Sequence, residues 1–159
     1  MNVWEALTEE FATDLPDTAE FVRVILRLLV AAFLGGVVGF QRQREGKEAG
    51  LRTHMLVSLG AALFVLTALN SGIALDQLSR VIQGVALGIG FIGGGVILKL
   101  KETREIHGLT TAADIWIAAA VGLACGFGRF WVALVGVLLT LVILTFFRRL
   151  EQHRGKVPR

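Results

Sequence analysis

The stretch GIGFIGGG, Gly88 to Gly95, decides how the whole sequence is interpreted. Gly88, Gly90 and Gly93 match the G-x-G-x-x-G spacing with which dinucleotide-binding proteins hold a pyrophosphate. Asp114 follows about twenty residues after this motif, where such proteins place the acid that contacts the ribose. The same glycines would also suit the close packing of a transmembrane helix. The rest of the chain distinguishes the two interpretations.

The composition is that of a membrane protein and not of a soluble enzyme. Of the 159 residues, 54% are apolar and 18% are charged, whereas soluble domains are roughly 25% charged. The formal net charge of +3 is too small to indicate nucleic-acid binding. A single cysteine, Cys125, excludes an internal disulfide. Neither a hydrolase constellation nor a metal-ligand spacing is visible, so we expect no enzyme activity, no metal and no other cofactor.

Five apolar segments follow one another along the chain, at 24–40, 55–69, 81–98, 112–127 and 130–147. Most are slightly shorter than the roughly 20 residues that cross a bilayer, so flanking residues must contribute. They cannot all be buried helices of a soluble domain, because too little polar sequence remains to cover them. The sequence therefore predicts an all-α integral membrane protein with about five transmembrane helices between residues 22 and 147.

Basic residues are concentrated on one side of the predicted membrane. The loops 41–54 and 99–111 and the tail 148–159 carry twelve Lys and Arg residues, against four on or near the other side. The positive-inside rule then places the C-terminal tail in the cytoplasm and the acidic segment 1–21 outside. Apolar residues at helical spacing predict that segment 1–21 lies along the outer interface, with a frayed terminus as the alternative.

The glycines of the opening stretch lie inside the third predicted span. The apolar run continues without a break from residue 85 to 98, and a helix is the default for backbone in lipid. Glycines four residues apart let helices approach closely, and this spacing recurs in the first and fourth spans. We therefore predict helix packing, within one bundle or between copies of the chain, and not nucleotide binding. The predicted packing glycines are Gly35, Gly39, Gly84, Gly88, Gly90, Gly94, Gly122 and Gly126.

Two polar residues near the spans allow alternative roles. If Thr111 is the N-cap of the fourth helix, Asp114 occupies the third position of a capping box. Alternatively, Asp114 faces Arg52 or a bound cation at the cytoplasmic rim. Arg27 lies three residues inside the first span and either extends to the outer headgroups or contacts the interior of the bundle.

Two predicted cytoplasmic loops, GKEAGLRTHM and KETREIHGLTTAAD, each precede a span. Together with the tail they form a basic surface that suits anionic lipid, a phosphate-bearing solute or an acidic partner. Ordinary attraction between lipid headgroups and positive-inside charge explains the same pattern equally well. Lys47, His107 and Asp114 are candidate functional residues of this rim.

These loops and their neighbouring spans resemble the membrane domain of the MgtC/SapB family, from about residue 30 to residue 128. The likeness lies in three ordered motifs, GGVVGFQRQREGKEAGLRTHMLVSLGAALF, RVIQGVALGIGFIGGGVI and HGLTTAADIWIAAAVGLACGFG. The family pattern usually has an acid at the position of Gln41 and a small or hydroxyl residue at that of Asp114. Only twelve residues follow Phe147, so the chain resembles the short form without the soluble C-terminal domain.

The resemblance implies a multi-pass protein of the bacterial inner membrane, linked to survival at low magnesium and, in pathogens, to virulence inside host cells. It implies a non-enzymatic role, which is restraint of the rotary ATP synthase through contact in the membrane. The resemblance also gives functional candidates by motif. These are Arg52, Thr53, His54, Gly108, Leu109, Thr110 and Thr111.

Partners and the competing function are expectations of the same kind. We expect the bilayer and a second copy of the chain, as a dimer through the small-residue faces, to be partners, with the ATP synthase as a further one. The alternative function is a small ion or anionic-solute transporter or channel. A cation path should place ionisable groups along the spans, and this chain has few of them. An anion path through glycine-broken helices remains open.

Overall fold

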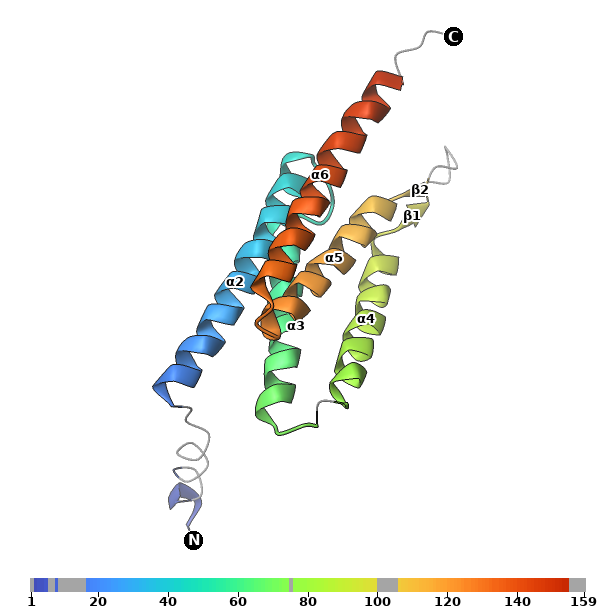
Figure 1. Ribbon diagram of the computed structural model, residues 1–159. Coiled ribbons are helices and arrows are strands. Elements are labelled where there is room, and N and C mark those ends of the chain that lie inside the picture. Colours follow the sequence, from blue (N-terminus) through green and yellow to red (C-terminus); the bar gives the residue numbers. More distant parts are fainter. Residues whose placement is uncertain (1, 6–7, 9–16, 75, 100–105, 155–159) are drawn as a thin grey trace.

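The computed structural model describes residues 2–5, 8, 17–74, 76–99 and 106–154, and five long helices dominate it (Figure 1). The helices are α2 (Thr18–Arg44), α3 (Leu51–Asn70), α4 (Leu78–Gly95), α5 (Leu109–Gly126) and α6 (Phe130–Arg154). A short antiparallel pair of strands, β1 (Leu98–Lys99) and β2 (Ile106–His107), lies between α4 and α5. Leu98 pairs with His107 and Lys99 with Ile106.

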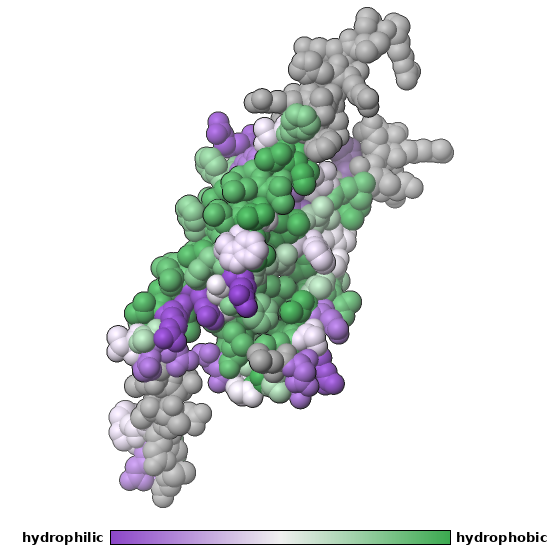
Figure 2. All heavy atoms as spheres, in the orientation of Figure 1, coloured by the Kyte–Doolittle hydropathy of each residue, from purple (hydrophilic) through white to green (hydrophobic). Residues whose placement is uncertain are grey.

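The helices agree with the predicted all-α membrane fold. By length and composition, α2, α3, α4 and α5 can each cross a membrane, and Phe130–Phe146 of α6 is a shorter apolar segment. Hydrophobic residues cover most of the middle of the face shown in Figure 2. The glycines of the opening stretch lie within α4, so the strand–turn–helix that a dinucleotide loop requires is absent from this part of the chain.

Several boundaries differ from the predicted ones for local reasons. Helix α2 begins at Thr18 because Asp17 caps it, its carboxylate accepting a hydrogen bond from the backbone N–H of Glu20 at 2.6 Å. It continues to Arg44 because the Gln and Arg residues of 41–44 are good helix formers. Helix α4 ends at Gly95, where three successive glycines weaken the helix before the chain enters β1.

The ends of the chain are described only in part. The predicted interfacial helix of segment 1–21 falls mostly on residues 1, 6–7 and 9–16, which lie outside the described residues. Helix α6 continues beyond the apolar segment to Arg154, so the first part of the predicted tail 148–159 is helical.

Helix α5 is the centre of the bundle and α4 is its periphery. Half of the residues in the most apolar stretch of α5 are buried, against 17% in α4. The most extensive packing is between α2 and α3 and between α3 and α5, whereas α3 and α4 touch much less. Figure 1 shows α4 diverging from α3. We call the end where α2 and α4 finish and α3 and α5 begin the basic end of the bundle.

Glycines allow the central helices to approach closely. A Cβ atom added at Gly35 would lie 2.6 Å from the carbonyl oxygen of His54, and one at Gly39 would lie 2.8 Å from that of Gly50. A Cβ at Gly122 would collide with the carbonyl oxygen of Ser58. A Cβ added at Gly126 would lie 2.8 Å from the Cβ of Val65. Small residues thus bring the α2, α3 and α5 backbones together, as membrane helices require.

The glycines of α4 behave differently. A Cβ added at Gly84, Gly88, Gly90 or Gly94 would have no described atom within 4 Å. The expectation that they pack within one bundle is therefore wrong for these four positions, because they lie off the side of α4 that meets α5, where Gly93 is next to Ala112. Their packing role, if they have one, belongs to contacts outside the described chain.

Arg27 contacts the interior of the bundle at the end opposite the basic one. Its Nη1 donates a hydrogen bond to the carbonyl oxygen of Gly126 at 2.9 Å, where α5 finishes. The last carbonyls of a helix have no partner within the helix and carry its negative dipole end, so a guanidinium is favourable there. The headgroup alternative for Arg27 is therefore not the arrangement adopted.

Candidate functional site: a buried arginine cluster at the basic end

The candidate rim residues all lie at the basic end, but they separate into two sets. The side chains of the first set face outward: Lys47, Arg52, His107, Leu109 and Thr110 are exposed, and Thr53 is half-buried. The side chains of the second set are inside the bundle: His54, Thr111 and Asp114 are 0%, 2% and 3% exposed. Only the second set can build a site within the fold.

Arg42, in the last turn of α2, is the residue on which the buried set converges. It is 2% exposed, and its Nε lies 2.5 Å from Oδ2 of Asp114 on α5. Its Nη1 lies 2.9 Å from Oε2 of Glu45, and its Nη2 donates to the Thr111 hydroxyl at 3.3 Å. We call Arg42, Glu45, Thr111 and Asp114 the Arg42 cluster.

Local structure explains how α5 presents its two residues to Arg42. Gly108 precedes α5 with φ of +86°, and a Cβ there would collide with the carbonyl oxygen of Val96, so only glycine fits this turn. The helix then starts at Leu109, which places Thr111 and Asp114 three residues apart on one face. The predicted capping box is therefore wrong, because Thr111 lies inside the helix and Gly108 is the N-cap.

The electrostatics of the cluster depend on one guanidinium between two carboxylates. Arg42 brings one positive charge, and Glu45 and Asp114 bring two negative ones, with Lys47 on the adjoining loop near Asp114. Among the described residues, Arg42 Nε and Asp114 Oδ2 have no hydrogen-bond partner apart from this ion pair. Removing Arg42 would leave the buried Asp114 carboxylate without its cation, which is far more destabilising than replacing both residues by apolar ones.

Two further polar groups lie inside the bundle near the cluster. His54 Nδ1 lies 2.9 Å from the carbonyl oxygen of Gly50, so Nδ1 carries the proton and donates it. His54 Nε2 is buried and has no hydrogen-bond partner in the described part of the chain. Ser58 donates to the carbonyl oxygen of Ala31 at 2.8 Å, joining α3 to α2.

The arrangement holds helices together. Within the described residues, no group of three or more His, Cys, Asp or Glu side chains is placed to hold a metal ion. Arg42 contacts Thr111 and Asp114 on the neighbouring helix, and the predicted partner of Asp114 is corrected from Arg52 to Arg42. The cluster ties the last turn of α2 to the first turns of α5.

Arg42 and Glu45 are not among the site residues predicted from sequence, because the sequence pattern places both in the loop 41–54. A signal was present in the spacing. Arg42 follows Gly39 by three residues and Gly35 by seven, which places it on the same face of a continued helix. A charged residue on the face that carries packing glycines must be paired inside the bundle.

The chain was compared with known proteins. Residues 28–153 match the model of the MgtC family. The chain is 42% identical over 144 residues to protein SrpB of Synechococcus elongatus, a match that covers 84% of this chain and 79% of SrpB. It is 43% identical over 140 residues to the putative magnesium transporter YhiD of Escherichia coli K12 and 38% identical over 134 residues to protein MgtC of Salmonella typhimurium.

The last two matches each cover 84% of this chain but 63% of YhiD and 56% of MgtC, so the chain spans little more than half the length of these relatives. No solved structure matches the chain. The family model covers most of the chain and includes the five long helices, apart from the start of α2 and the last residue of α6. The chain therefore belongs to the MgtC family.

Proposed function

We propose that this chain is a non-enzymatic regulator in magnesium and ATP homeostasis, which acts by docking on a membrane partner such as the rotary ATP synthase. Family membership supports the setting, since relatives include MgtC and a protein named as a putative magnesium transporter. Because YhiD is named as a putative transporter, transport is the competing function. We further propose that the basic end is cytoplasmic and the membrane is the bacterial inner membrane.

The placement of charged residues favours regulation over transport. Arg42 is paired within its cluster at one end of the bundle, and Arg27 is bonded to Gly126 at the other. Between these ends, the described buried core is mostly apolar, with residues such as Ala62, Val121 and Cys125. The buried hydroxyl groups of Ser58 and Thr140 each donate a hydrogen bond to a backbone carbonyl. An ion path would instead need ionisable or polar groups along its length.

Helix α4 supplies a surface suited to docking. Gly90 and Gly94 lie one turn apart on the side of α4 that faces away from α3, beside Leu87 and Phe91, which are 79% and 86% exposed. A small-residue face flanked by large apolar side chains lets a second membrane helix approach closely. We propose that this face binds either a helix of the partner or α4 of a second copy, in a dimer.

Proton pumping in inverted membrane vesicles, with and without the protein, tests the proposal. Acidification is driven in turn by ATP and by respiration. Regulation of the synthase predicts that only the ATP-driven signal falls. An equal fall in both signals would mean that the protein makes the membrane leak, and the transport function would replace the proposal. No change in either signal would contradict both functions.

The variant Arg52→Ala is expected to lose most of this effect while inserting normally, because Arg52 is exposed at the rim and no span needs it. The measurement is ATP-driven acidification in vesicles that contain equal amounts of wild type and variant. Arg44→Ala, which removes another exposed arginine at the same end, is the matched control and should act as wild type. Loss of Arg52→Ala from the membrane fraction would show that the role of Arg52 is structural.

A further inference from the structure

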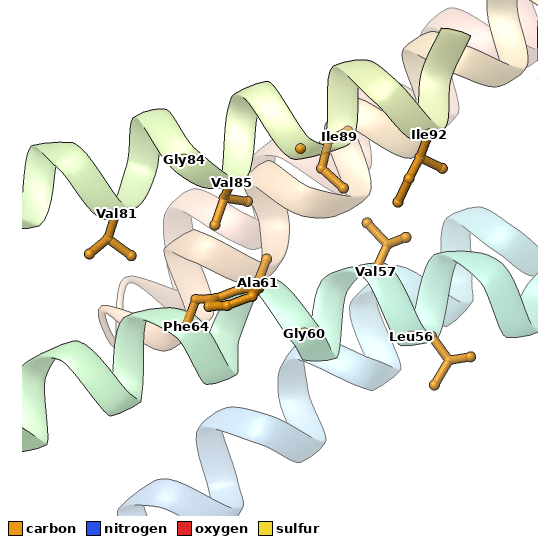
Figure 3. Close-up of a pocket in the computed structure, with 11 residues that line it drawn as sticks. Leu56, Val57, Gly60, Ala61, Phe64, Val81, Gly84, Val85, Ile89 and Ile92 are labelled. Atoms are coloured by element: carbon orange, nitrogen blue, oxygen red, sulfur yellow. The ribbon is translucent and has the colours of Figure 1, made fainter. Parts of the chain in front are cut away.

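A groove between α3 and α4 is independent of the docking face on the other side of α4. It has a volume of about 700 Å³, within the range of about 300–1,000 Å³ that is common for ligand sites. Val81, Val85 and Ile92 of α4 point toward α3, and Val57 of α3 points toward α4 (Figure 3). The groove is therefore lined by apolar side chains along its length.

Glycines create the space. Gly60 of α3 and Gly84 and Gly88 of α4 line the groove, and a Cβ at any of them would have no described atom within 4 Å. Because an empty apolar groove leaves its lining atoms without contacts on one side, an occupant is favoured by dispersion. In a bilayer, this occupant is apolar where it meets the groove.

The length and volume of the groove suit a thin occupant. Between Val81 and Ile92, α4 rises about 16 Å at 1.5 Å per residue. The space between α3 and α4 along this length is about 700 Å³. A linear hydrocarbon chain fits within it.

The charged residues at the two ends of the groove indicate at which end a polar headgroup would lie. Arg52 is exposed in the first turn of α3, four residues before the lining residue Leu56, and Lys47 lies exposed in the preceding loop. At the other end, Arg80 is exposed beside the lining residue Val81, but Asp76 lies exposed nearby and balances it. Glu48 is also exposed at the Arg52 end, but Lys47 and Arg52 outnumber it, whereas Arg80 and Asp76 balance. A phosphate is therefore attracted more strongly to the Arg52 end.

We propose that the groove binds one acyl chain of an anionic phospholipid, whose phosphate lies against Arg52. The lipid fills the space between α3 and α4 and joins the peripheral helix to the bundle. This inference concerns only α3, α4 and their rim, and it holds whether or not the chain regulates an ATP synthase.

The acyl-chain site is tested by filling the groove. The delipidated protein in detergent is titrated with dioleoylphosphatidylglycerol, and bound lipid is counted by native mass spectrometry. The variant Gly84→Leu/Gly88→Leu is expected to lose the single tight site. The control, Gly136→Leu, places the same side chain at an open position of α6, away from the groove and from the docking face, and should bind as wild type. Equal binding by the groove variant and wild type would overturn the proposal.

The headgroup contact is tested with a pair of arginine variants. Arg52→Ala is expected to weaken phosphatidylglycerol binding about fivefold, which corresponds to about 1 kcal/mol per basic residue near an anionic surface. Arg80→Ala should leave binding unchanged. An equal loss in both variants, or none in Arg52→Ala, would overturn the placement of the phosphate. Competition by glycerol phosphate alone would overturn the lipid as the ligand.

The oligomeric state provides an independent outcome of the same experiment. Native mass spectrometry reports the number of chains in each complex together with its lipids. We expect the groove variant to keep the oligomeric state of wild type while losing lipid. A groove variant that loses a second chain and keeps its lipid would identify the groove as an interface between copies and contradict the proposal.

Discussion

Replacement of Arg42 by alanine is expected to lower the free energy of unfolding by about 3–5 kcal/mol, because removal of one partner leaves buried charge uncompensated. Arg42 is 2% exposed and contacts Glu45, Thr111 and Asp114 at once. The variant leaves the Asp114 carboxylate, 3% exposed, without its cation. The measurement is equilibrium unfolding in detergent micelles, followed by far-UV circular dichroism.

Arg42→Lys is expected to recover only part of this loss. A lysine ammonium is a point charge, whereas the guanidinium of Arg42 reaches three groups in different directions through Nε, Nη1 and Nη2. Such a difference between two cations of equal charge would show that geometry as well as charge holds the cluster together.

The double variant Arg42→Met/Asp114→Leu separates the loss of the ion pair from the exposure of an unpaired charge. Replacement of both partners by apolar groups is often neutral or stabilising, so the double variant should be markedly more stable than Arg42→Ala. Arg44→Ala is the matched control, since Arg44 is exposed two residues away. A loss below about 1 kcal/mol in Arg42→Ala, the size typical of a surface pair, would contradict the structural role of the cluster.

The fold could be predicted from sequence because the bilayer leaves few alternatives. Five apolar segments in 159 residues admit only a bundle of helices. Each segment lies in a helix, except that α4 and α5 end at Gly95 and Gly126, before the third and fourth segments do. The helix boundaries were less predictable, since they depend on local caps and turns. Examples are the Asp17 cap of α2 and the turn at Gly108, where the clash that demands glycine comes from Val96 in a different element.

The candidate site was predictable in location but not in its contacts. Motifs drew attention to Thr111 and His54, and the capping and rim arguments drew attention to Asp114, yet Arg42 was counted as loop charge. Which residues pair depends on how far α2 continues past Phe40, and hydropathy cannot show this because the segment 41–44 is polar. Of the two positions expected to depart from the family pattern, Asp114 belongs to this cluster, and Gln41 donates a hydrogen bond to Glu45 of the cluster at 3.4 Å.

The spacing of the glycines is visible in the sequence, but which of them contact another helix is not. Four glycines with the same spacing on α2 and α5 meet a neighbouring backbone or side chain, whereas four on α4 meet open space. Sequence alone cannot distinguish them, because small-xxx-small spacing states only that a helix is able to approach another closely. Which faces of the helices meet is decided by packing of the whole bundle.

This difference makes Gly122→Ala the second large expected effect. A Cβ at Gly122 would collide with the carbonyl oxygen of Ser58, which is backbone and cannot turn aside, so α5 and α3 must separate. Overpacking of this kind costs about 1–3 kcal/mol, and the better helix propensity of alanine offsets less than about 1 kcal/mol of it. We expect a lower free energy of unfolding, measured as for Arg42→Ala.

Gly88→Ala is the matched control, since it makes the same chemical change in the middle of another apolar helix. A Cβ at Gly88 has no described atom within 4 Å, so only the propensity gain remains, and stability should be unchanged or higher by up to about 1 kcal/mol. A lower free energy of unfolding for Gly122→Ala together with an unchanged or higher one for Gly88→Ala would demonstrate that α3 and α5 meet through Gly122. Equal destabilisation by both would mean that α4 packs against a neighbour as closely as α5 does, which contradicts its peripheral place in the bundle.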